Sequence, residues 1–127
     1  MKKQKDAIVW AEIPVLNFDR AKEFYSKLLN YEMQDQSYGK FRMGFLPVDP
    51  NLKGVGGAIV QGEGYTPSSL GSKVYLNAGD DLKDVLARVD IAGGRVIQAK
   101  TLITGEIGYY AVFEDTEGNH VCLYSRK

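Results

Sequence analysis

The sequence predicts an α+β protein made of two copies of a strand–helix–strand–strand–strand (βαβββ) module. Three observations lead to this prediction: a strand pattern passes into a helical pattern near the start of the chain, the same succession restarts at residue 73, and a Gly- and Ser-rich stretch separates the two. We expect a single domain over residues 1–127, with module one at about 7–62, a connector at about 62–72 and module two at about 73–127.

The first strand and the first helix set the pattern. Aliphatic and mixed residues alternate over 9–15, which predicts a strand with one apolar face and a second face that carries Trp10 and Glu12. Apolar residues then recur every three or four positions over 18–29, as on one face of a helix. Asn17 is the predicted N-cap of this helix.

The remaining segments complete the two modules. Runs of strand-forming residues bounded by Gly, Pro and Asn predict strands, and a helical run stopped by Gly93-Gly94 predicts the second helix. The predicted strands are 38–48, 55–61, 73–78, 95–99, 109–114 and 119–125, and the predicted helix spans about 81–92. Gly56 and Gly57 lack the spacing of a phosphate-binding loop, so they predict a tight bend or a close approach of the backbone.

Composition narrows the classes of function. Sixteen basic residues balance 16 acidic ones and are scattered along the chain, so we expect no nucleic-acid partner. No apolar run approaches the roughly 20 residues that cross a bilayer, and the basic start is not followed by a signal-peptide pattern. The single cysteine, Cys122, excludes a disulfide framework and favours a reducing, cytoplasmic setting. We therefore expect a cytoplasmic protein that binds neither nucleic acid nor membrane.

Five short motifs follow one another in a characteristic order. They are Trp-Ala-Glu-Ile-Pro-Val from Trp10, Asp19-Arg20-Ala21 with Phe24-Tyr25, Gly56-Gly57-Ala58, Asp80-Asp81-Leu82 leading to Gly93-Gly94, and Phe113-Glu114-Asp115-Thr116-Glu117-Gly118-Asn119. In this order they resemble the vicinal oxygen chelate superfamily, the group of glyoxalase I, bleomycin-resistance proteins and extradiol dioxygenases. The resemblance covers nearly the whole chain. It implies that the modules curl into a cup-like mixed sheet with the helices outside and a ligand site inside, and that two copies pair as a homodimer.

The resemblance also implies where a metal would be held. Metal-dependent members place one ligand, usually His or Glu, early in the first strand of each module and one in its last strand. The matching positions here are Trp10, Lys73 or Val74, Ile59 or Gln61, and Cys122. With a single His in the chain, a His-rich site for a divalent metal cannot be assembled. We expect no cofactor, and a divalent metal on ligands of another kind stays open.

Glu12 is the leading candidate for a functional group. It follows Ala11 on a strand expected to be central, where an isolated carboxylate is costly unless it is paired or protonated. Two interpretations stay open. One is a structural carboxylate hydrogen-bonded to Tyr75, Asn77 or a backbone amide, and the other is an acid/base or ligand-anchoring group that lines the cup.

Six further residues complete the predicted ligand-binding set. Trp10, Tyr75 and Tyr110 offer flat rings that can stack on a planar ligand. The other three, Gln61, Asn77 and Cys122, occupy neighbouring strand positions. Cys122 is also explained as a small buried filler, because His120 lies too far along the strand to activate its thiol.

Together these features predict a metal-independent protein that binds a small organic molecule. The alternative is a lyase, isomerase or dioxygenase-like enzyme that uses Glu12 as acid or base, with a metal on unrecognised ligands. A third interpretation is an oligomerising or regulatory module with a vestigial cup.

Overall fold

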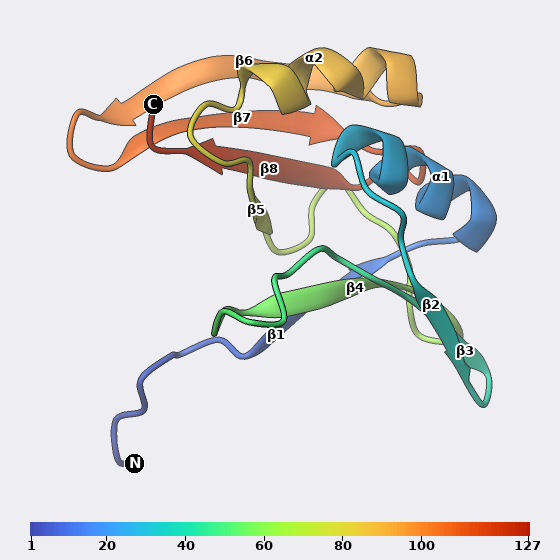
Figure 1. Ribbon diagram of the computed structural model, residues 1–127. Helices are drawn as coiled ribbons and strands as arrows, with labels where there is room; N and C mark the ends of the chain where they lie inside the picture. Colours follow the sequence, from blue (N-terminus) through green and yellow to red (C-terminus); the bar gives the residue numbers. More distant parts are fainter.

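The computed structural model describes residues 1–127, and its elements repeat one order twice (Figure 1). Module one contains β1 (Trp10–Pro14), α1 (Phe18–Leu28), β2 (Asp35–Tyr38), β3 (Phe41–Phe45) and β4 (Gly56–Gln61). Module two contains β5 (Tyr75–Asn77), α2 (Lys83–Ala92), β6 (Arg95–Thr104), β7 (Gly108–Glu114) and β8 (His120–Ser125). The predicted α+β fold with two βαβββ modules is confirmed. Neither helix is both long and apolar enough to cross a membrane.

Each module forms its own mixed sheet, with the order β1-β4-β3-β2 in the first and β5-β8-β7-β6 in the second. In both sheets the first strand lies at the edge, parallel to the last strand of its module, and the other pairs are antiparallel. The expectation that Glu12 lies on a central strand was therefore wrong. No strand pair joins the two sheets, so the predicted cup is not closed. In Figure 1 the blue-to-green first sheet lies apart from the second sheet, and β5 is the strand of the second sheet that lies toward the first.

Two predicted strands differ from the structure. The predicted strand 38–48 is a hairpin, in which β2 and β3 meet at a turn that includes Gly39, whose φ is 59°. Glycine adopts this left-handed conformation without strain, so Gly39 ends one strand and lets the next begin. The predicted strand 95–99 is longer in the structure and continues to Thr104 as β6. Its pairing with β7 is interrupted by shifts in register, so β6 does not need a regular alternation of apolar and polar residues.

Helix α1 of module one packs against the sheet of module two. The rings of Phe24 and Tyr25 meet the ring of Phe113 on β7, with centroids 5.8 and 6.4 Å apart. One cluster of 17 buried apolar residues accordingly draws on both modules. The predicted N-cap is confirmed, since the Asn17 side chain accepts the N–H of Arg20 at 3.1 Å.

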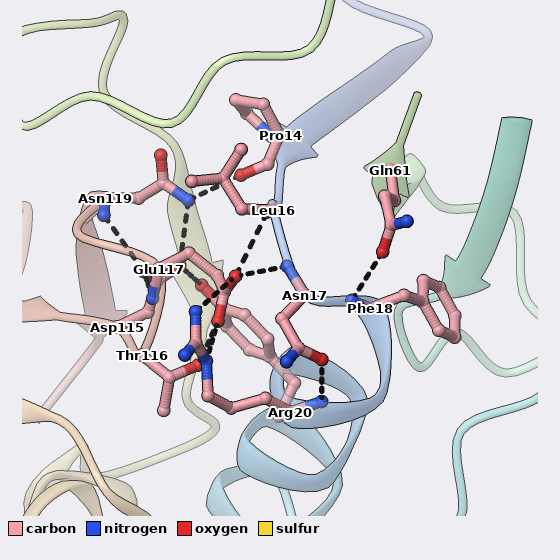
Figure 2. A network of polar contacts seen from close by, with 11 residues as sticks. Pro14, Leu16, Asn17, Phe18, Arg20, Gln61, Asp115, Thr116, Glu117 and Asn119 are labelled. Carbon is pink, nitrogen blue, oxygen red and sulfur yellow. Dashed lines mark hydrogen bonds and ion pairs between the residues drawn. The ribbon is translucent and has the colours of Figure 1, made fainter. Parts of the chain in front are cut away.

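A buried carboxylate joins the two modules at the start of α1 (Figure 2). Glu117, in the turn between β7 and β8, has a fully buried side chain. Its Oε1 accepts the N–H groups of Leu16 at 3.0 Å and Asn17 at 2.7 Å, and its Oε2 accepts Nε of Arg20 at 2.7 Å. The hydroxyl of Thr116 adds a further hydrogen bond at 2.9 Å. Glu117 thus pairs the free amides at the start of α1 with a negative charge, the arrangement that the helix dipole favours.

The same turn holds two more ties between the modules. Oδ2 of Asp115 accepts the hydroxyl of Tyr25 at 2.6 Å, and Nδ2 of Asn119 donates to the carbonyl of Pro14 at 2.7 Å. Oδ1 of Asn119 accepts the N–H of Ser68 at 3.0 Å, which fixes the connector to the same point. β1, α1 and the connector are therefore all anchored on one turn of module two.

Replacing Glu117 tests this anchor. We expect Glu117→Gln to lower the free energy of unfolding by about 2 kcal/mol at neutral pH, because Arg20 loses its charged acceptor and one buried donor is left without a partner. Urea denaturation measures the change. The matched control is Glu23→Gln, which removes a carboxylate from an exposed i,i+4 ion pair with Lys27 and should leave the stability nearly unchanged.

The pH dependence adds a second readout. Burial acts to raise the pKa of Glu117, but the hydrogen bonds from Arg20, Asn17 and Thr116 outweigh it, and the pKa lies below its usual value. Its stabilising effect is therefore complete above the unfolded pKa of about 4.3 and disappears as the pH falls through the lower folded pKa. Glu117→Gln should flatten this acid loss of stability, and an unchanged acid profile would contradict the assignment.

Candidate functional site

A cleft of about 550 Å³ lies between the edges of the two sheets. β1 and the start of β4 form one wall and the segment 72–77 around β5 forms the other, so both modules contribute. Ten of the 17 residues that line it are hydrophobic. The cleft therefore suits an organic molecule that is mainly apolar.

Trp10 and Glu12 form a connected group on β1. Nε1 of Trp10 donates to Oε2 of Glu12 at 3.2 Å, and the hydroxyl of Tyr65 donates to Oε1 of Glu12 at 2.6 Å. This hydrogen bond also raises the pKa of Tyr65. Trp10 is 43% exposed and meets the ring of Phe45 edge-on, with centroids 6.4 Å apart. The indole is thus held from two sides and still presents part of its surface to the cleft.

The glycines of β4 make this arrangement possible. A Cβ at Gly57 would lie 2.4 Å from the backbone oxygen of Ala11, and one at Gly56 would lie 3.4 Å from the ring of Trp10. A side chain at Gly57 would therefore push β1 away from β4. This confirms the predicted close approach of the backbone at Gly57, whereas Gly56 lies against the side chain of Trp10.

Tyr75 and Asn77 line the opposite wall. Tyr75 is 54% exposed and is paired in register with Cys122 of β8. Oδ1 of Asn77 accepts the N–H of Gly79 at 3.0 Å, which bends the chain after β5. Neither residue bonds to Glu12; the partners of its carboxylate are Trp10 and Tyr65, so the partners expected from the sequence were wrong.

The other three predicted residues do not line the cleft. Oε1 of Gln61 accepts the N–H of Phe18 at 2.7 Å, on the α1 side of the first sheet (Figure 2). Tyr110 lies on β7, and Cys122 lies on β8 beside its register partner Tyr75. Cys122 is 2% exposed, and burial is the main cause that raises the pKa of its thiol. The interpretation of Cys122 as a small buried filler fits this position.

Sequence reasoning missed Tyr65. It lies in the connector, where no periodic pattern points to a face, yet it holds the candidate carboxylate. The one available signal was that Tyr65 is the single aromatic residue in a stretch rich in Gly, Ser and Pro.

The side chains do not fit a resident metal ion. No three His, Cys, Asp or Glu residues lie close enough together to hold one. His120, the single histidine, is partly buried, and its Nε2 lies 3.2 Å from Oε1 of Glu114. The position of the first-strand ligand is held by Trp10, whose indole cannot coordinate a metal.

Comparison with known proteins supports the glyoxalase-like fold. No family model matches the chain. A glyoxylase-like domain-containing protein of Didymella fabae is 27% identical over 118 residues, which cover 91% of this chain and 90% of that protein. Glyoxalase I of Zea mays has a TM-score of 0.69 at 17% identity over 93% of this chain, which spans only 44% of the maize chain.

Two other solved structures match over nearly their full length. The antibiotic binding protein TnmS3 of Streptomyces sp. CB03234 has a TM-score of 0.68 at 23% identity. The match covers 99% of this chain and 100% of the TnmS3 chain. A glyoxalase/bleomycin resistance protein/dioxygenase family enzyme of Burkholderia phytofirmans has a TM-score of 0.66 at 17% identity, over 94% of this chain and 98% of that one. The fold is thus that of the glyoxalase and bleomycin-resistance proteins. The resemblance to the vicinal oxygen chelate superfamily is confirmed.

Proposed function

We propose that this protein binds a small organic molecule, without a metal, in the cleft between β1 and β5. The observation that carries the proposal is the cleft, which joins Trp10 and Glu12 of module one to Tyr75 and Asn77 of module two. Its volume of about 550 Å³ falls within the range of roughly 300–1,000 Å³ typical of small-molecule sites. A vestigial cup would not need a cavity of this size.

The comparisons support a binding role. TnmS3 is described as an antibiotic binding protein, and it matches this chain from end to end. Binding of this kind needs ring surfaces and a few placed polar groups rather than a reacting centre. The cleft supplies both, with Trp10 and Tyr75 as rings and Glu12 and Asn77 as polar groups.

A homodimer is part of the proposal. β1 and β5 are edge strands that expose Trp10 and Tyr75, and exposed edges with apolar side chains are normally covered by another chain. A second copy of the chain would close the open side of the cleft. Light scattering should give twice the mass of the 14.1 kDa chain, and a monomer that binds ligand with full affinity would contradict this part.

An enzyme that uses Glu12 as acid or base is the second candidate, because Glu12 is exposed to the cleft. Trp10 and Tyr65 already donate hydrogen bonds to its carboxylate, which suits a fixed anchor better than a group that must exchange a proton. A turnover activity that Glu12→Gln abolishes while ligand affinity is kept would favour this candidate.

Trp10 provides a direct test of the binding site, since it is the single tryptophan of the chain. We expect planar aromatic compounds from a small-molecule library to change its fluorescence. Trp10→Leu should weaken their binding by about tenfold or more in calorimetry, because the stacking surface is lost. Tyr38→Leu is the matched control, since Tyr38 is a 48% exposed aromatic residue outside the cleft. Equal losses in both variants would refute the site.

Metal independence has its own test. Chelator-treated protein should show no rise in melting temperature with Mg²⁺, Mn²⁺, Fe²⁺, Ni²⁺ or Zn²⁺, because no cluster of ligands is present to bind them. A metal bound to the native state at a hundredfold excess over its Kd would add about 2.7 kcal/mol of stability. Elemental analysis of the purified protein gives the control, and a stoichiometric metal would overturn this part of the proposal.

A further inference from the structure

A second cavity of about 270 Å³ lies between the connector and β1. It shares three lining residues with the cleft, namely Glu12, Ser72 and Val74. Glu12 therefore borders both cavities. A ligand that occupied both of them would lie against this residue.

The two cavities differ in their chemistry. Only three of the ten residues that line the second cavity are hydrophobic, against ten of 17 in the cleft. Thr66, Ser68 and Ser72 supply hydroxyl groups, which can both donate and accept hydrogen bonds. The hydroxyl oxygen of Ser68 accepts the N–H of Leu70 at 3.0 Å, which leaves its own proton free to donate. Such a wall matches a substituent that carries several hydroxyl groups.

The charges differ as well. Glu12 lines both cavities and is the one charged residue that lines the second, whereas Lys73 lines the cleft and its Nζ donates to the carbonyl of Ser69 in the connector at 3.4 Å. A carboxylate offers about four acceptor positions, and Glu12 uses two of them for Trp10 and Tyr65. Glu12 can therefore accept further donors, and its negative charge favours a protonated amine.

We propose that the second cavity is a subsite for a hydroxyl-rich, amine-bearing substituent of the ligand, such as an amino sugar, whose planar apolar ring system occupies the cleft beside Trp10. This inference rests on the proposed binding function, and it names the class of ligand as aromatic compounds that carry an amino sugar.

The test compares daunorubicin, a planar ring system with an amino sugar, with its sugar-free aglycone by calorimetry. The wild-type protein should bind the glycoside at least about tenfold more tightly than the aglycone. Glu12→Gln should weaken the glycoside more than the aglycone, since only the glycoside places an amine near the carboxylate. The comparison on wild-type protein stands even if a variant fails to fold.

A variant that adds a large side chain at the second cavity provides a sharper control. Gly71 lines the second cavity but not the cleft, and a Cβ there would meet nothing within 4 Å, so Gly71→Phe adds bulk without an immediate clash. This variant should lose the preference for the glycoside and keep its affinity for the aglycone. Gly105→Phe, at an equally open glycine in the turn between β6 and β7, should keep both.

The outcomes separate the two proposals. Equal binding of both compounds, or a preference that survives in Gly71→Phe, would overturn the subsite and leave the cleft as a binding site. Failure of both compounds to bind would overturn the subsite together with the proposed function.

Discussion

The buried carboxylate of Glu117 determines how the two modules meet. It belongs to module two, but the backbone N–H groups that it accepts lie at the junction of β1 and α1 in module one. A carboxylate with a fully buried side chain is stable only when its donors are in place, so the turn and the start of α1 must adopt one mutual position. Because Pro14 is tied to Asn119 of the same turn, the direction of β1 is fixed as well.

The cleft is a consequence of this junction combined with the order of the strands. Each module places its first strand at a sheet edge, and the anchored turn brings these two edges, β1 and β5, to opposite sides of one space. α1 and Phe113 fill the interior on the other side of the second sheet with packed rings. The apolar core therefore lies on the helix side, and the cleft lies on the opposite side.

Sequence periodicity predicted the two modules because the change from period two to helical spacing is local and occurs twice. It could not show which strands pair, since strand order depends on contacts between distant segments. Pro14 was a missed signal, because a proline in a strand favours an edge over a central position. Tyr65 lay beyond such reasoning for another reason: its role comes from the path of an aperiodic connector, which only the three-dimensional structure defines.

Two glutamates show why the same residue type serves different purposes in this protein. Glu117 receives five hydrogen bonds from four residues and has a fully buried side chain, so none of its acceptor capacity is left for a ligand. Glu12 is exposed, receives two hydrogen bonds and lines both cavities, so it keeps acceptor positions that a bound molecule can use. A carboxylate with every acceptor position filled stabilises the fold. One that is held in place but only partly satisfied is suited to recognising a donor from outside.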